Sequence, residues 1–141
     1  MQGAFPSSPE DIHAAFPQPS AIAAPASRYS HGVEHAADAR RVVVSGQIRM
    51  RPDGSLADGF EAQAAVAFDN LLAVVAEAGM AASDLVKVTA FATEPGQVAV
   101  FRAVRDRKLG GHAPAATYLE VAGLARPDYL VEIEAEVVKE P

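Results

Sequence analysis

Three carboxylates alternate along the last apolar segment of the chain, where single hydrophobic residues separate Glu132, Glu134 and Glu136. A carboxylate can act as a general base, or hold an attacking water, when its pKa and geometry suit that task. The same alternation is expected of a strand whose outer face meets water, so solvated or ion-paired glutamates explain it equally well. The pattern supplies a candidate base but does not choose among the three.

Two histidines, His31 and His35, would share one face of an extended segment, and neutral imidazole is a common metal ligand. No third ligand follows at a recognisable spacing, so we expect no metal site. The chain has no cysteine. That excludes a disulfide framework, a thiolate zinc site and a cysteine nucleophile. Neither a Gly-x-Ser-x-Gly motif nor a phosphate-binding loop occurs.

The charge balance favours some partners over others. Twelve basic residues stand against 18 acidic ones, for a net charge of −6. This acidic balance and the lack of a basic run argue against nucleic acid as a partner. No apolar stretch approaches the ~18 residues of a membrane span, and Glu10 and Asp11 lie where a secretory signal would be basic. We therefore expect a cytoplasmic protein with no membrane contact.

Residues 1–25 are rich in Pro, Ala and Ser without a steady period, and we expect an irregular N-terminal arm. Residues 26–141 are expected to form a single domain, since their length suits one core. Within it, Val33 and residues 41–46 predict two early strands. A turn at 52–54 would let a short third segment, residues 47–50, fold over.

Helical periodicity is clearest in the middle of the chain. Apolar residues at Ala64, Phe68, Leu71 and Val75 predict a helix over 59–78, with Gly79 as its left-handed C′ residue. A second helix is expected to follow a Pro-Gly break. The remaining segments are predicted as one helix at 97–109 and strands at 85–92, 116–121 and 130–138.

This order predicts an α+β fold in which two helices cover one face of a mixed sheet. The other face would then be bare. Thr89 and Phe91 are expected on it, together with either Tyr118 or Leu119. Partly apolar bare faces commonly mark an association surface, so the pattern weakly favours an oligomer.

Several segments together resemble the RidA (YjgF-like) superfamily over about residues 25–138. The matching segments are 42–48, 60–63, 70–72, 78–79, 84–91, 114–124 and 131–135. The resemblance implies a chorismate-mutase-like fold and a homotrimer with a cleft between each pair of neighbouring subunits. Archetypal members hydrolyse enamines and imines such as 2-aminoacrylate to keto acids and ammonia, and they need no cofactor or metal.

The resemblance also suggests site residues. Glu132 matches the cleft glutamate that is thought to position a water, and Tyr29 matches a tyrosine that could donate to the ligand. Gly46 and Gln47 match the segment that lines the cleft with backbone groups. Interface packing for Tyr29 and a β-bulge at Gly46 remain alternatives.

One position departs from the archetype. Its cleft arginine lies in a Pro-x-Arg-Ser/Thr motif, and here Ala116 stands in the arginine's place, followed by Thr117. Alanine cannot imitate the two-pronged match of a guanidinium to a carboxylate. Arg102 or Arg105 on the second helix could supply the lost charge, although a surface pair of Arg102 with Asp106 or Glu94 is the plainer interpretation. His31 is expected beside Tyr29 in the cleft.

Two functions therefore remain open. The first is a small-molecule deaminase or related hydrolase whose substrate differs from 2-aminoacrylate, with Glu132 directing water. The second is a trimer that binds a metabolite or a partner protein without turnover. Glu132, Tyr29 and Gly46 favour the enzyme, whereas Ala116 favours the binder or a changed substrate.

Overall fold

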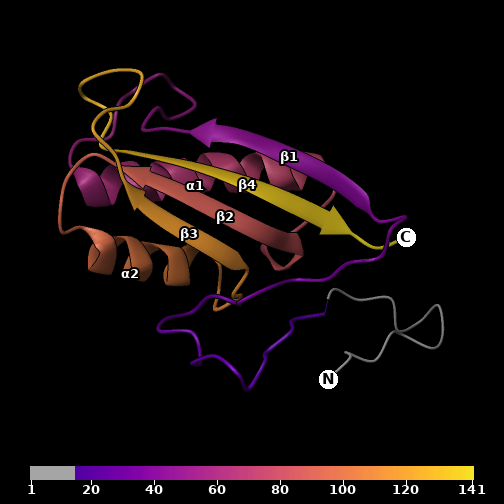
Figure 1. The fold of residues 1–141 in the computed structure, drawn as a ribbon. Helices are drawn as coiled ribbons and strands as arrows, with labels where there is room; N and C mark the ends of the chain where they lie inside the picture. Colours follow the sequence, from indigo (N-terminus) through magenta and orange to yellow (C-terminus); the bar gives the residue numbers. More distant parts are fainter. Residues whose placement is uncertain (1–14) are drawn as a thin grey trace.

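The computed structural model describes residues 15–141, so most of the expected arm at 1–25 lies outside it. The elements follow in a simple order (Figure 1). They are β1 (Arg40–Gln47), α1 (Phe60–Glu77), the 3₁₀ turn η2 (Ala82–Asp84), β2 (Leu85–Ala92), α2 (Val98–Lys108), β3 (Ala115–Glu120) and β4 (Val131–Lys139). Both predicted helices and four of the predicted strands are present, within one or two residues of their expected bounds.

The four strands form one mixed sheet in the order β1-β4-β2-β3. β4 pairs antiparallel with both of its neighbours, while β2 and β3 are parallel. A parallel pair needs a crossover, and α2 supplies it. The predicted α+β class is confirmed.

α1 forms where the apolar stripe predicts it. Ala64, Phe68, Leu71 and Val75 are each buried. They face the core because residues three and four apart share one side of a helix. The helix stops at Gly79, whose φ of 75° is the left-handed conformation that glycine adopts without strain.

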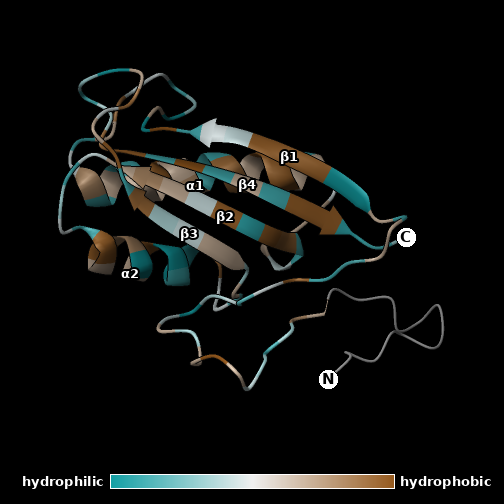
Figure 2. Ribbon diagram, viewed as in Figure 1, coloured by the Kyte–Doolittle hydropathy of each residue, from teal (hydrophilic) through white to brown (hydrophobic). Residues whose placement is uncertain are grey.

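Both helices lie on the same side of the sheet, and α1 packs against β1 and β4 (Figure 1). Along β4 the odd-numbered residues from Val131 to Val137 are buried in this core. α2 joins the core through Phe101, whose ring lies 5.7 Å from that of Phe68 and 5.0 Å from that of Tyr118. Figure 2 shows the resulting hydrophobic and hydrophilic stretches along the strands.

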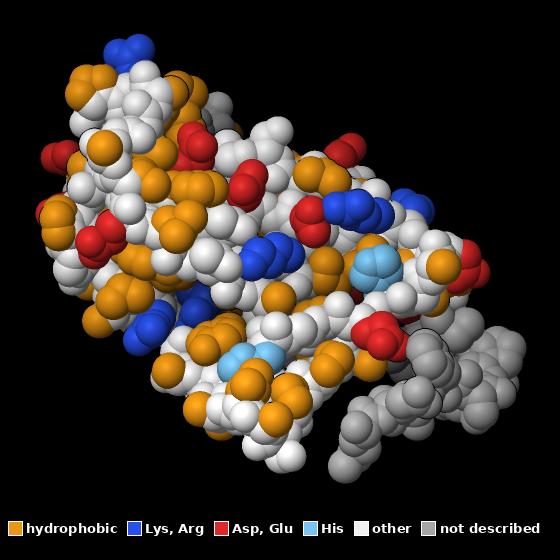
Figure 3. All heavy atoms as spheres, in the orientation of Figure 1, with side chains coloured by type: hydrophobic (Ala, Val, Ile, Leu, Met, Phe, Trp, Pro, Cys, Tyr) orange, Lys and Arg blue, Asp and Glu red, His pale blue; other side chains and the backbone are white. Residues whose placement is uncertain are grey.

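Neither helix covers the opposite face of the sheet, which stays bare among residues 15–141. Residues paired directly across strands point to the same face. Phe91 pairs with both Glu132 and Leu119, which places all three on the bare face. Leu119 is 44% exposed there and Val43 of β1 is 66% exposed. Figure 3 shows hydrophobic side chains next to charged ones in this view.

Two local predictions need correction. Val33 does not lie in a strand, because residues 15–39 have no long partner to pair with; Ala15 and Glu34 form only an isolated bridge. The short third segment is reduced to a single bridge from Met50 to Leu56 around the predicted turn. Among residues 15–141, no helix is both long enough and apolar enough to cross a membrane.

Candidate functional site

Glu132 lies directly over Gly46, where β4 and β1 meet. A Cβ added to Gly46 would lie 2.7 Å from the Cγ, Cδ and Oε2 atoms of Glu132. The β1–β4 register shifts between Val44 and Gln47, so the backbone bulges at this point. The bulge alternative for Gly46 is therefore confirmed, and the missing Cβ also lets the carboxylate of Glu132 approach the backbone. That Gly46 lines a ligand cleft stays a prediction. We call Gly46 and Glu132 the sheet-face half.

The three alternating glutamates differ in their surroundings. Glu136 forms an ion pair with Arg41, with 2.7 Å between Oε1 and Nη2, and Glu134 is exposed. The side chain of Glu132 is half-buried and forms no hydrogen bond or ion pair with another of residues 15–141. The side chain of Glu134 has no such partner either, so Glu132 is distinguished from it by partial burial and by its approach to Gly46. Next to it, the side-chain amide of Gln47 donates to the carbonyl of Ser45.

Tyr29 lies at the β3 edge of the sheet, because the segment around it runs along that edge strand. The amide of Ser30 donates to the carbonyl of Pro114 at 3.0 Å, and Ser30 bridges Ala115 in parallel. The rings of Tyr29 and His31 lie 5.8 Å apart, edge to face. His31 Nε2 contacts the carbonyl oxygen of Ala23 at 2.7 Å, which holds the imidazole beside Tyr29.

A pocket of about 220 Å³ lies between α2 and β3. We call it the edge pocket. The small Ala116 opens this pocket, and the polar residues that line it are Ser27, Tyr29, Arg102, Arg105, Thr117 and Tyr118. Four of the predicted site residues thus come together in one cavity. Thr117 Oγ1 itself accepts a hydrogen bond from Lys87 Nζ at 2.7 Å.

Among residues 15–141, the surface pair preferred for Arg102 does not form, and another arginine of α2 takes one of its expected partners. Asp106 does not pair with Arg102; it contacts Arg105, whose Nε donates to Asp106 Oδ1 at 3.0 Å. Arg105 is only 3% exposed, because its position on α2 faces the sheet. The burial of Arg105 was not predicted from the sequence. Arg105 follows Phe101 by four residues, so both lie on the same buried side of α2, and this spacing could have indicated its burial.

Tyr118 and Leu119 are the two alternatives for the bare face, and the register of β3 decides between them. Tyr118 pairs with Ala90, which is buried against the helices, so it points into the helix side while Leu119 takes the bare face. Its hydroxyl has no hydrogen-bond partner among residues 15–141. Burial raises the pKa of this phenol, and the nearby charge of Glu120 raises it further. Tyr118 is therefore a neutral O–H donor at physiological pH.

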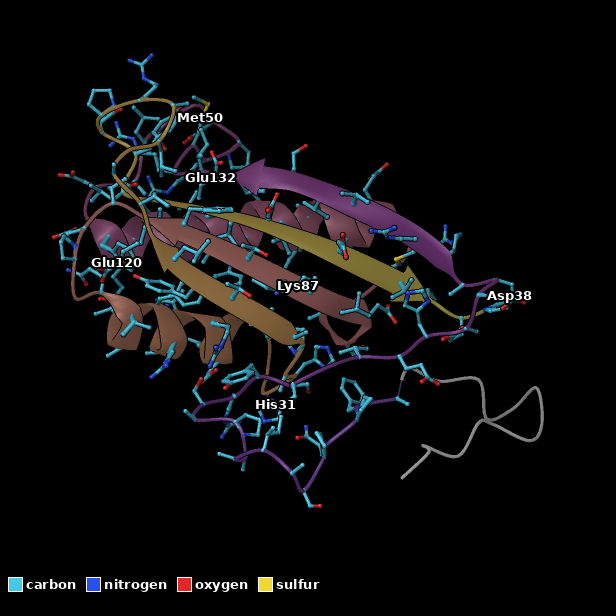
Figure 4. The ribbon with its side chains drawn as sticks, viewed as in Figure 1. His31, Asp38, Met50, Lys87, Glu120 and Glu132 are labelled. Carbon is cyan, nitrogen blue, oxygen red and sulfur yellow. The ribbon has the colours of Figure 1, made fainter. Side chains whose placement is uncertain are left out.

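The sheet-face half and the edge pocket do not meet within one chain. Glu132 points to the bare face, whereas Ala116 pairs with the buried Val88 and points to the helix side. β4 and β3 are also two strand spacings apart, about 10 Å. Figure 4 shows Glu132 beside β1 and His31 beyond β3.

Other features of the described residues offer less chemistry. A wider hollow of about 730 Å³ lies where α1 and α2 begin, but none of the predicted site residues lines it. No group of three or more His, Asp or Glu within 15–141 lies close enough to hold a metal ion.

Comparison with known proteins places this geometry in a family. Residues 19–139 match the family described as endoribonuclease L-PSP. The chain belongs to this family, the RidA family. A 2-iminobutanoate/2-iminopropanoate deaminase of Salmonella typhimurium is 35% identical over 102 residues, covering 70% of this chain and 79% of that protein.

Two solved structures support the same fold. YyfB of Yersinia pestis, a Rid-family protein of unknown function, has a TM-score of 0.80 at 26% identity, covering 89% of this chain and 98% of that one. Escherichia coli TdcF, solved with bound serine, has a TM-score of 0.66 at 30% identity, covering 84% and 91%. This RidA-family chain therefore keeps the family architecture with Ala116 in the edge pocket.

Proposed function

We propose that this RidA-family protein is a cofactor-independent imine deaminase that works in clefts between copies of a homotrimer. The observation that carries the proposal is Glu132, a half-buried carboxylate without a polar partner among residues 15–141, held against the backbone at Gly46. The names of its deaminase relatives supply the reaction class.

The reaction adds one water to a C=N bond. The water oxygen bonds to the carbon of the protonated imine while Glu132 accepts a proton from that water, and the C=N π electrons move to nitrogen, which gives a neutral carbinolamine. Glu132 then returns this proton to nitrogen. The C–N bond breaks and its electron pair leaves on ammonia, while the C=O bond forms and the hydroxyl proton passes to Glu132 and on to solvent. Imine and water thus give a ketone and ammonia with no redox change, which is why a single positioned carboxylate is sufficient.

A complete site requires a second copy of the chain. Glu132 and the edge pocket lie on opposite sides of one sheet. The exposed Val43 and Leu119 on the bare face suit an apolar contact with a neighbour. We propose that the sheet-face half of one subunit completes the edge pocket of the next, as closed rotational symmetry allows.

Mixed trimers test this arrangement. Glu132→Gln removes the carboxylate, and Ala116→Leu fills the edge pocket. We expect each variant to be inactive alone. If the two halves come from different subunits, an equal mixture of refolded variants regains about a quarter of the wild-type activity, since about one cleft in four then has both intact halves. No recovery in verified mixed trimers would contradict the shared site.

Light scattering checks the assembly itself. At micromolar concentration we expect three times the 14.7 kDa of one chain. A mass of one chain would contradict both the trimer and the shared cleft.

A non-catalytic metabolite-binding trimer is the second candidate, and Ala116 favours it because the archetypal clamp is missing. The assay that separates the two couples an amino-acid oxidase, which releases 2-imino acids from a panel of amino acids, to ammonia detection. Acceleration that Glu132→Gln abolishes supports the deaminase. Binding of keto acids without acceleration supports the binder. We keep the expectation that RNA is not a partner, because the net charge is −6.

A further inference from the structure

The edge pocket contains a buried arginine whose hydrogen bonds are incomplete. Arg105 is 3% exposed, and its Nη2 has no hydrogen-bond partner among residues 15–141. Asp106 Oδ1 lies 3.0 Å from Nη2, but it is aligned with Nε, from which it accepts. Asp106 thus positions the guanidinium and leaves one N–H group unsatisfied. A buried donor without an acceptor is costly, so an acceptor is expected in the pocket.

A second unsatisfied donor lines the same pocket. The hydroxyl of Tyr118 is buried and unpartnered among the described residues, while its ring packs on Phe101. Arg105 Nη2 and the Tyr118 hydroxyl are thus two donor groups without a hydrogen-bond partner among residues 15–141. Such a pair suits a carboxylate, which has two oxygens and can only accept when it is ionised.

Ala116 provides the space. The pocket of about 220 Å³ equals about seven water molecules at ~30 Å³ each, which is room for a small organic acid. A long side chain at position 116 would occupy this volume. The small, uncharged Ala116 therefore leaves open the pocket that the charged Arg105 lines.

We propose that Arg105 and Tyr118 form a carboxylate-binding site in the edge pocket, so that α2 supplies the anchor that β3 lacks in this chain. The inference rests on the proposed function only in taking the bound carboxylate to be that of the imine substrate. The ligand class is a small 2-imino or 2-keto monocarboxylate whose carboxylate enters the helix side of β3.

Calorimetric titration with 2-oxobutanoate tests the site, with neutral 2-oxobutanamide as the matched ligand. We expect the acid to bind the wild type and the amide to bind at least about tenfold more weakly. Arg105→Met should weaken binding of the acid about tenfold or more, and Tyr118→Phe several-fold, because hydrogen bonds to charged groups are lost.

Arg107→Met is the matched control, since Arg107 is an exposed arginine of the same helix. It should bind the acid as the wild type does. Tyr118→Phe removes one oxygen atom and keeps the ring, so it tests the site even if Arg105→Met fails to fold. Equal binding of acid and amide, or wild-type affinity in Tyr118→Phe and Arg105→Met, would overturn the site.

Ammonia release separates this inference from the proposed function. If the acid binds through Arg105 and Tyr118 but no imine is hydrolysed faster, the carboxylate site is supported and the deaminase is contradicted. If hydrolysis is accelerated equally by the wild type and both variants, the deaminase is supported and the carboxylate site is overturned.

Discussion

The sheet-face half and the edge pocket are built by different means. Glu132 is held by main-chain geometry, because it lies against Gly46 at a bulge between two paired strands. The edge pocket is bounded mostly by side chains of α2 and β3, and its volume depends on the small size of Ala116.

This difference indicates which half tolerates amino-acid substitution without a change in the backbone. Moving Glu132 requires either a change of register, which would disturb the sheet, or an atom added to Gly46, which would displace the carboxylate itself. Changing the edge pocket needs only a substitution at its rim. Under the proposed function, the sheet-face half would fix the reaction and the edge pocket would select the ligand, and the two can be tested separately.

The largest expected effect is on the sheet-face half. Glu132→Gln should lower kcat/KM for imine hydrolysis about 100-fold or more, because a positioned general base contributes about 10²–10⁴ in rate. Ammonia release measures the loss, and circular dichroism checks the fold. Glu134→Gln, on the same face but exposed, is the control and should stay near wild type. Retention of activity by Glu132→Gln would place the base elsewhere.

On 2-aminoacrylate, the wild type should be about 100-fold slower than a relative with the clamp arginine. Arg105 would hold the carboxylate from α2 and not from β3, so the reacting carbon of this small substrate would lie away from its archetypal place. Ala116→Arg should fold yet stay slow, because the new guanidinium enters a pocket that already contains Arg105. The assay couples a dehydratase that releases 2-aminoacrylate to pyruvate formation. A gain to the rate of the relative would show that only the clamp is missing.

A smaller effect is expected at Gly46. Gly46→Ala places a methyl group 2.7 Å from Glu132 and forces that flexible side chain to move. We expect about a tenfold drop in kcat, the scale of a displaced catalytic group, with little change in Tm. Ser45→Ala, on the adjacent exposed residue, is the control. Unchanged kcat in Gly46→Ala would mean that the position of Glu132 is not critical.

The smallest effect concerns the exposed ion pair on the same face. Arg41→Ala breaks the contact with Glu136 and should change the free energy of unfolding by less than about 1 kcal/mol. Urea titration measures this change. A greater loss of stability would show that Glu136 and Arg41 belong to a larger interface between subunits. The surroundings of Glu136 would then resemble those proposed for Glu132 more closely than they do in a single chain.

Sequence patterns predicted most of the fold but only part of the site. The helix at Phe60–Glu77 and the strand at Leu85–Ala92 follow from periodicity, because their apolar residues are numerous and regularly spaced. The face of Tyr118 could not be predicted, since β3 is short and its orientation depends on its register with β2.

The expected strand at Val33 failed for a related reason. Its residues suit an extended backbone, but a strand also needs a partner, and only an isolated bridge to the arm is available to this segment. The burial of Arg105 depends on how α2 lies against β3, which charge patterning alone does not reveal.

The pairing of β1 with β4 has a consequence for how the molecule forms. Arg40 pairs with Lys139, so 99 residues separate partners in the same ladder. Contacts between such distant positions close large loops and tend to form slowly. The β2–α2–β3 unit, by contrast, is local and can assemble while synthesis continues. On the ribosome, the edge pocket can therefore take shape early, whereas Glu132 cannot reach Gly46 until β4 has emerged.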